Sequence, residues 1–298
     1  MMPATKKREA LREALEASEP VVAVGAHDAM TAQLIETHGF DAVWVSGFGV
    51  STMTHALPDL NLVTLTETLD ASRRIDAATR LPVIADCDNG FGGLTNVVRT
   101  VREFERAGIA GICVEDNTFP KRNSLYRGES LRELIPVDEQ ARRIRAARDA
   151  QETDEFVFIA RVEALIAGHG VEAAVERADA YVDAGADAIL IHSRDKTLVE
   201  IESFLESWSG VGSVPLVAVP TLFPTFTAEE LADKGFSMVI FANHPMRAAV
   251  QAMEDTLRTL QEERRAAAVD PTIAKVDHVF ELVGTKEMIA LEEGVGVG

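Results

Sequence analysis

The segment that decides the fold is Glu105-Arg106-Ala107-Gly108-Ile109-Ala110-Gly111-Ile112-Cys113-Val114. Its first part ends a stretch with helical character, and Gly108 is a residue type that tolerates the left-handed backbone of a helix cap. The apolar run that follows is short and continuous, which is typical of a strand buried on both faces of a parallel sheet. The segment therefore predicts a helix, a glycine cap and a buried strand, in that order.

The same pattern recurs at Gly39, Gly185 and Gly235, each of which separates a helical segment from an apolar run. Four further apolar runs complete a set of eight predicted strands: 21–24, 40–45, 81–85, 109–114, 156–160, 186–191, 214–219 and 236–241. Strands joined by helices are parallel, and eight of them over about 250 residues predict a (β/α)8 TIM-type barrel. A doubly wound open sheet is the alternative.

The placement of polar residues favours the barrel over the open sheet. Polar side chains come directly after seven of the eight predicted strands: Ser46, Asp86 with Asp88, Glu115 with Asp116, Arg161 with Glu163, His192 with Ser193, Thr221, and Asn243 with His244. In a closed barrel these positions face one another at one rim, where ligands bind. In an open sheet the outer positions could not meet.

Composition limits the class of partner. The chain has 298 residues, 47% of them hydrophobic, and a formal net charge of −19, which disfavours binding to nucleic acid or to anionic membranes. Its two cysteines are too few for a disulfide framework and fit a reducing cytoplasm. Residues 1–16 carry charges and no apolar core, and no stretch of the chain approaches 18 uncharged apolar residues, so neither a signal peptide nor a membrane span is expected.

The C-terminal region 245–298 exceeds what a closed barrel needs. We expect a long helix over 245–268 and a second over 270–288, with Val276, Val279, Phe280 and Leu282 forming an apolar side. This surplus could cover a partner subunit or pack back on the same barrel. No linker interrupts the chain, so residues 1–298 are expected to form one domain.

Three acids are candidates for a metal site. Asp86 and Asp88 end the third predicted strand before a glycine-rich turn, and Glu115 ends the neighbouring one. Carboxylates with positions left open for water suit Mg²⁺, whereas the spacing of the histidines does not indicate zinc. Helix capping and turn formation are the alternative roles, although they explain one acid more easily than three.

Several other polar residues are candidates for ligand binding. Arg161 follows an apolar run, where a guanidinium needs an anion: a substrate carboxylate, or Glu163 or Glu115. His192 and Ser193 could donate hydrogen bonds to an oxyanion, and Ser46-Gly47-Phe48 could offer backbone N–H groups, with Trp44 in the barrel core. Lys121 and Asn123 could close over an anionic substrate, although a solvated charged loop would look the same.

The chain resembles the isocitrate lyase and phosphoenolpyruvate mutase superfamily. The resemblance runs over nearly the whole length, through Gly25 to Asp28, Trp44 to Gly47, Asp86 to Gly92, Glu115 to Ser124, Ala160 to Ala164, Gly185 to Ser193, Val219 to Thr221, Ala242 to His244 and Val276 to Phe280. It implies a barrel whose last helix is exchanged between subunits of a homodimer or homotetramer. It also implies Mg²⁺ held largely through water by the acids at Asp86, Asp88 and Glu115, with Asp59 nearby.

The gating loop divides this superfamily. Members that cleave carbon–carbon bonds carry Lys-Arg-Cys-Gly-His there, phosphonopyruvate hydrolases tend to carry Thr-Ser, and mutases carry Asn-Ser, as in Lys121-Arg122-Asn123-Ser124. The resemblance therefore implies a Mg²⁺-dependent phosphoenolpyruvate mutase that interconverts phosphoenolpyruvate and phosphonopyruvate. The alternatives are a phosphonopyruvate hydrolase, a lyase or hydrolase of a 2-oxo or 2-hydroxy diacid, and a non-catalytic barrel.

The resemblance also assigns roles to residues. It implies a catalytic set of Asp59, Lys121, Asn123, Arg161 and His192, and substrate contacts from Trp44, Ser46, Gly47, Phe48, Asn123, Ser124, Arg161, His192 and Ser193. Three positions depart from the mutase pattern. Asn117 stands where a lysine is expected, and Asn89 and Gly93 replace a threonine and an asparagine.

Overall fold

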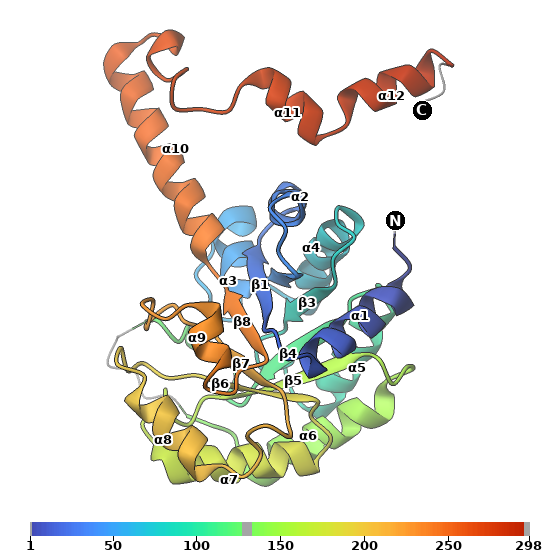
Figure 1. Cartoon of the computed structure of the whole chain (residues 1–298), viewed down its shortest axis with the longest axis vertical. Helices are drawn as coiled ribbons and strands as arrows, with labels where there is room; N and C mark the ends of the chain where they lie inside the picture. Colours follow the sequence, from blue (N-terminus) through green and yellow to red (C-terminus); the bar gives the residue numbers. More distant parts are fainter. Residues whose placement is uncertain (1, 127–132, 295–298) are drawn as a thin grey trace. The chain divides into compact units, whose positions relative to one another are not determined.

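Eight parallel strands close into a barrel in chain order, with β1 pairing to both β2 and β8. The structure is a computed structural model that describes residues 2–126 and 133–294. Helices surround the strands (Figure 1), and the predicted (β/α)8 barrel is confirmed. The strands are β1 Val21–Ala26, β2 Ala42–Val45, β3 Val83–Asp86, β4 Gly111–Glu115, β5 Val157–Val162, β6 Ala188–Ile191, β7 Leu216–Ala218 and β8 Met238–Phe241.

Helix α1 Ala4–Glu16 precedes the first strand, and helices connect the successive strands that follow. The connecting helices are α2 Ala29–Thr37, α3 Gly47–Gly49, α4 Leu65–Ala77, α5 Leu94–Arg106, α6 Val137–Ala150, α7 Gly170–Asp183, α8 Val199–Ser207 and α9 Ala228–Ala232, with a π-helical turn at Val50–Thr54 after α3. The connection from β2 to α4 and the one from β4 to α6 are the longer ones. Both contribute side chains to the site described below.

Most of the strands begin about two residues later than the sequence predicts, and the glycine caps explain why. Gly108 has φ +92°, and the N–H of Ile109 donates to the carbonyl of Phe104 at 3.2 Å. This bond spans the helix end in the way expected of a Schellman cap, so Ile109 still belongs to the helix terminus. Ala186 and Phe236 make the same bond after Gly185 and Gly235.

The alternation of side chains along each strand separates two apolar layers. On β5, Val157 and Ile159 pack in the cluster that fills the barrel, whereas Phe158 and Ala160 pack in the larger cluster between the strands and the helices. Because strand side chains alternate with a period of two, Arg161 continues the inward-facing row. The same alternation places Asp86 and Glu115 on the inward-facing rows of β3 and β4, and His192 just beyond the inward-facing row of β6.

Helix α1 closes the end of the barrel opposite the polar rim. Leu11 and Leu15 pack with the inner cluster. Lys7 Nζ donates to the carbonyl of Thr79 at 2.9 Å, and Arg8 Nε donates to that of Ile109 at 3.2 Å. These bonds satisfy carbonyl groups next to the strand starts, so the carboxyl ends of the strands are the open side of the barrel.

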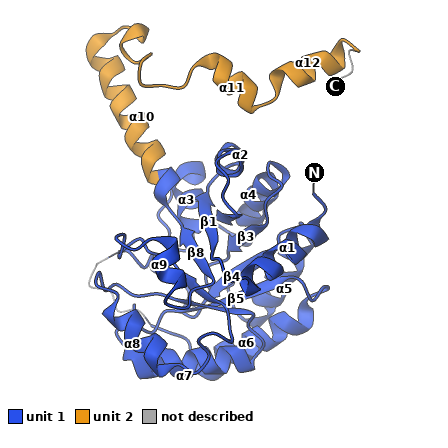
Figure 2. Ribbon diagram, viewed as in Figure 1, with its two compact units in different colours: residues 1–246 blue, residues 247–298 orange. Residues whose placement is uncertain are grey.

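The chain divides into two compact units, residues 1–246 and 247–298 (Figure 2). The second contains most of α10 His244–Glu263, a short 3-10 turn at Ala266–Ala268, α11 Val276–Leu282 and α12 Thr285–Glu292. The single helix expected over 270–288 is wrong, because Gly284 at φ +65° separates two helices. Within the described residues, none of the helices combines the length and apolarity needed to cross a bilayer.

Candidate active site

The inward-facing rows bring most of the predicted site residues to one cavity at the carboxyl ends of the strands. Of the residues proposed from sequence, the cavity is lined by Trp44, Ser46, Phe48, Asp59, Asp86, Glu115, Lys121, Asn123, Ser124, Arg161 and His192. Val219, Thr221, Ala242 and Asn243 complete the opposite wall, from the ends of β7 and β8. The cavity is therefore built from the carboxyl ends of seven strands, β2 to β8, and from the two long connections.

Acidic groups gather on one side of this cavity. Asp86 is the last residue of β3 and Glu115 the last of β4, while Asp88 follows in the turn after β3. A Cβ added to Gly47 would lie 3.3 Å from Asp86 and 3.4 Å from Asp88, so the backbone of Gly47 borders both carboxylates. Burial raises the pKa of Asp88 to about 6 and that of Glu115 to about 8.

Lys121 and Asn123 lie against these acids. Lys121 is buried, and its ammonium contacts Asp59 at 2.7 Å and also forms an ion pair with Asp88. Burial opposes the charge of this ammonium, but Asp88 and Asp59 raise its pKa well above the usual value. Asn123 donates to Asp59 at 2.6 Å. Asp59 thus holds both loop side chains toward the cavity.

Arg161 is the centre of a second polar cluster. Its guanidinium donates to Glu163 at 2.6 Å, and to the hydroxyl of Ser124 at 2.5 Å. It also lies 2.9 Å from the Nδ1 atom of His192, and 3.4 Å from Glu115. The pairing with Glu163 and Glu115 that the sequence allowed is present, and the same side chain lines the cavity. Arg161 can therefore meet a ligand anion while remaining paired.

The residue that follows a cavity-lining residue at a strand end points away from the cavity. Ser193 follows His192 by one position; it is fully buried, and its hydroxyl forms a short hydrogen bond to Glu200 at 2.5 Å. It does not line the cavity. Asp116 likewise faces outward, where it accepts from Arg177 at 2.9 Å and from Tyr181 at 2.7 Å. Since strand neighbours alternate, His192 and Glu115 face the cavity, and the residue after each contacts a surrounding helix.

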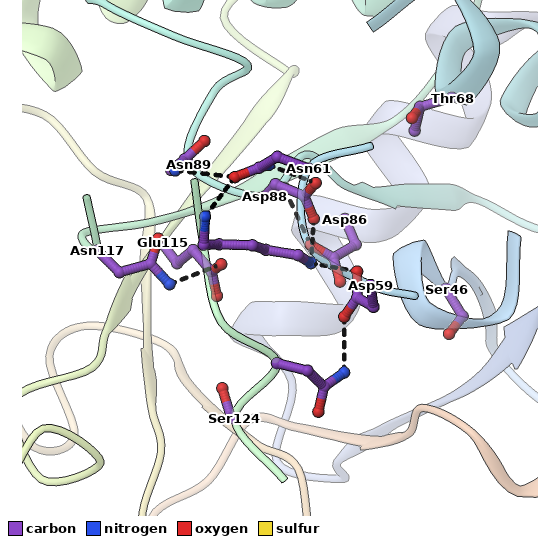
Figure 3. A network of polar contacts seen from close by, with 12 residues as sticks. Ser46, Asp59, Asn61, Thr68, Asp86, Asp88, Asn89, Glu115, Asn117 and Ser124 are labelled. Atoms are coloured by element: carbon purple, nitrogen blue, oxygen red, sulfur yellow. Dashed lines mark hydrogen bonds and ion pairs between the residues drawn. The ribbon is translucent and has the colours of Figure 1, made fainter. Parts of the chain in front are cut away.

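Asn117 and Asn61 have contacts that the sequence alone did not reveal. Asn117 is buried and donates to Glu115 at 2.9 Å, so an amide takes the place of the expected cation beside this carboxylate. Asn61 donates to Asp88 at 2.9 Å and accepts from the backbone N–H of Lys121 at 2.6 Å (Figure 3). Asn61 lies in an irregular connection with no periodic pattern, which left no sequence signal for its role.

The raised pKa values predict how stability depends on pH. The pKa of Asp88 rises from 3.8 to about 6 and that of Glu115 from 4.5 to about 8 on folding, with burial the main cause. Because the folded protein holds these protons more tightly than the unfolded chain, its free energy of unfolding falls as pH rises from about 4 to about 8. Between pH 5 and 8 we expect a loss of at least about 1.4 kcal/mol, the equivalent of one pKa unit.

Urea denaturation in the presence of a chelator measures this loss. Glu115→Gln removes one of the two groups and is expected to flatten the dependence, whereas Glu9→Gln at an exposed position is expected to leave it unchanged. A free energy of unfolding that rises over this pH range would contradict the prediction.

The acid side of the cavity has the chemistry of a cation site with few protein ligands. Among the described residues, no group of three or more His, Cys, Asp or Glu side chains is arranged to hold one ion directly. Asp86 is nevertheless close enough to both Asp88 and Glu115 that its charge helps to raise the pKa of each. Mg²⁺ commonly keeps several waters and binds through one or two carboxylates, so these residues fit such an ion better than a zinc cage.

Known proteins resemble this chain over nearly its full length. Residues 11–261 match the family model described as phosphoenolpyruvate phosphomutase. A phosphonopyruvate hydrolase of Variovorax sp. (strain Pal2) is 42% identical over 287 residues, covering 96% of this chain and 98% of that protein. A phosphoenolpyruvate phosphomutase of Tetrahymena pyriformis is 39% identical over 284 residues, covering 95% of this chain and 93% of that protein.

Solved structures show the same architecture. A phosphoenolpyruvate phosphomutase from Streptomyces platensis subsp. rosaceus matches with a TM-score of 0.92 and 41% identity, covering 96% of this chain and 98% of that one. A phosphonopyruvate hydrolase in complex with oxalate and Mg²⁺ matches with a TM-score of 0.89 and 40% identity, covering 98% of this chain and 99% of that one. The relatives thus include both a mutase and a hydrolase at nearly equal similarity.

Proposed function

Because the chain belongs to the phosphoenolpyruvate phosphomutase family, we propose that it interconverts phosphoenolpyruvate and phosphonopyruvate as a mutase. It is an enzyme of the superfamily that also contains isocitrate lyase. The observation that carries the proposal is Asn123. This residue lines the cavity beside Arg161 and His192, and its amide is held by Asp59 at 2.6 Å.

The placement of Asn123 suits phosphoryl transfer within one bound molecule. Its amide is oriented at both ends, since Nδ2 donates to Asp59 and Oδ1 accepts from the N–H of Leu125 at 2.9 Å. Arg161, His192 and Asn123 supply hydrogen-bond donors around the cavity. Because such donors are already oriented, they stabilise the negative charge that develops during phosphoryl transfer without having to reorganise. Correct positioning of the reacting groups accounts for much of the rate enhancement in this chemistry.

In the proposed reaction the phosphoryl group leaves the enol oxygen of phosphoenolpyruvate and is captured by the methylene carbon of the same molecule. One P–O bond breaks, one P–C bond forms, and no proton or electron is exchanged with the enzyme. Arg161 and Ser46 bind the carboxylate, while Lys121 and Ser124 keep the segment 117–126 over the cavity. Excluding water matters because attack by water at phosphorus would turn the isomerase into a hydrolase.

The proposed cofactor is Mg²⁺, held by Asp86, Asp88 and Glu115 largely through water. When bound, it supplies positive charge to the oxygens of the pyruvyl group. Two findings support it: the placement of Asp86 and Glu115 at the ends of neighbouring strands with Asp88 in the turn that follows β3, and the solved relative that contains Mg²⁺ with oxalate. Asp88 also contacts Lys121, so part of its charge is balanced by the protein itself.

Phosphorus NMR tests the proposed function directly. Phosphonopyruvate incubated with the enzyme and Mg²⁺ is expected to lose its phosphonate signal while a phosphate-ester signal of equal intensity appears. The same sample with a chelator in excess of Mg²⁺ serves as the control. A spectrum that does not change would refute activity on this substrate.

Phosphonopyruvate hydrolase is the second candidate, and one observation favours it. This chain is 42% identical to the Variovorax hydrolase and covers 98% of that protein. Both values are slightly above those for the Tetrahymena mutase, which are 39% and 93%. The same NMR sample separates the two. Inorganic phosphate and pyruvate in equal amounts would establish hydrolysis, whereas a mutase gives no inorganic phosphate.

A carbon–carbon lyase has less support from this cavity. The two cysteines, Cys87 and Cys113, are both buried, and burial raises the pKa of each thiol well above its usual value. Neither lines the cavity, where Asn123 and Ser124 occupy the loop. Release of pyruvate or oxalate from an alkylmalate or oxaloacetate would overturn this assignment.

We also propose that the C-terminal helices are exchanged between subunits of a homodimer or homotetramer. The support is the exposed apolar surface of residues 247–298, which includes Val276, Phe280, Met288 and Leu291, each more than half exposed. Apolar side chains gathered in this way mark an interaction surface. Sedimentation equilibrium that gives a monomer mass at micromolar protein would refute the exchange.

A further inference from the structure

Asn61 joins two parts of the cavity that are far apart in sequence. Its Oδ1 atom accepts from the backbone N–H of Lys121 at 2.6 Å, while its Nδ2 atom donates to Asp88 Oδ2 at 2.9 Å. Oδ1 also accepts from Asn89 at 3.3 Å. One amide therefore contacts the loop segment 117–126, the acid of the proposed cation site and the turn after β3 (Figure 3).

Only a side chain with both a donor and an acceptor can make these contacts. The partner of Oδ1 is the backbone N–H of Lys121, which can only donate, and the partner of Nδ2 is the ionised Asp88 carboxylate, which can only accept. An aspartate would place like charges together, and an apolar residue would remove the acceptor of the Lys121 N–H and the Asn61 donor to Asp88 Oδ2. The backbone at Asn61 has φ +58°, a conformation that asparagine and glycine adopt more readily than most residues.

We propose that Asn61 is a positioning residue that couples docking of the loop segment 117–126 to the orientation of the Asp88 carboxylate. When Lys121 N–H is bound to Oδ1, the amide plane is fixed and Nδ2 points at Asp88. When the segment leaves, the amide loses that constraint and Asp88 loses a fixed donor. The inference rests on the proposed function only in treating Asp88 as part of a cation site.

Two readouts that need no catalysis test this coupling. Trypsin cleavage after Lys121 and Arg122, followed by mass spectrometry, reports how often the segment leaves the cavity. Isothermal titration with MgCl₂ reports the affinity of the acid site. Asn61→Gly removes the amide while keeping the left-handed backbone accessible. Ala56→Gly is the matched control, because Ala56 is exposed and has φ +52° in the same connection.

We expect Asn61→Gly to be cleaved about fivefold faster than the unmodified protein, the effect of losing one hydrogen bond. Its affinity for Mg²⁺ is expected to fall about tenfold, as for other residues that orient a metal ligand. Ala56→Gly should change both readouts less than about twofold, a margin that corresponds to small surface effects. If Asn61 had a purely structural role, Asn61→Gly would lower the melting temperature but would not change the cleavage rate and the Mg²⁺ affinity together.

Three outcomes would overturn the proposal. They are cleavage of Asn61→Gly at the original rate, faster cleavage with unchanged Mg²⁺ affinity, and equal effects from Ala56→Gly. Should Asn61→Gly not fold by circular dichroism, hydrogen exchange in the unmodified protein decides, since the Lys121 amide must be protected. An unmodified protein that binds no Mg²⁺ would refute the proposed cofactor, while the trypsin comparison would still decide the role of Asn61 in loop docking.

Discussion

Replacing Asp59 by alanine is expected to lower kcat by about a thousandfold or more, because two cavity side chains lose their common anchor. Asp59 accepts from the ammonium of Lys121 at 2.7 Å and from the amide of Asn123 at 2.6 Å. Without it, the Asn123 amide loses the acceptor for its Nδ2 group, while its Oδ1 still accepts from the N–H of Leu125 within its own loop. Small displacements of groups that stabilise a transition state are costly, so the chemistry should suffer more than substrate binding.

The fold should survive this change. Lys121 retains its ion pair with Asp88, so the buried ammonium is not left without a partner. Phosphonopyruvate consumption by phosphorus NMR measures the rate, and circular dichroism confirms the barrel. Asp70→Ala removes a carboxylate from an exposed pair with Arg74 and should leave turnover intact. A rate for Asp59→Ala within about tenfold of the original would remove Asp59 from the proposed site.

Arg161→Met is expected to damage both activity and stability. The guanidinium is paired with Glu163, which is 1% exposed, and with Glu115, which is 4% exposed. Removing one partner of a buried ion pair leaves an uncompensated charge and costs about 3–5 kcal/mol in free energy of unfolding. The proposed substrate carboxylate also loses its partner, so kcat/KM should fall by about a thousandfold or more.

Arg161→Lys separates the two losses. A lysine keeps the positive charge, but its compact ammonium lacks the planar set of donors with which the guanidinium contacts Glu163, Ser124 and His192 at the same time. We therefore expect it to recover part of the free energy of unfolding, measured by urea denaturation, and little of kcat/KM. Arg99→Met, at an exposed position of α5, controls for loss of a surface arginine. Full activity in Arg161→Lys would show that the planar guanidinium is not required at this position.

Local patterns were sufficient to predict the barrel. Gly108, Gly185 and Gly235 cap helices through left-handed backbones, and the apolar runs that follow become buried parallel strands. These signals depend on residues near one another in sequence, so they can be read from the chain. The strand starts were misplaced by two residues because Ile109 is apolar in either position, whether it ends a helix or begins a strand.

Position at a strand end predicts which side chains reach the cavity. Asp86, Glu115, Arg161 and His192 were chosen because they close apolar runs, and all four line the cavity. Ser193 was chosen by the same rule but faces Glu200, since a shift of one residue along a strand reverses the side chain. A position next to a strand end places a residue at the rim of the barrel. The strand register decides whether its side chain points into the cavity or toward the helices.

The sequence by itself determined the alternation of helices and strands, and hence which residues stand at the open rim of the barrel. Only the tertiary structure decided that Lys121 reaches Asp59 and Asp88, that Asn117 binds Glu115 and that Asn61 links Lys121 to Asp88. The physical reason is the range of the interactions. Backbone periodicity and capping act over a few residues, whereas these contacts depend on two irregular connections that meet above the barrel and carry no periodic signal.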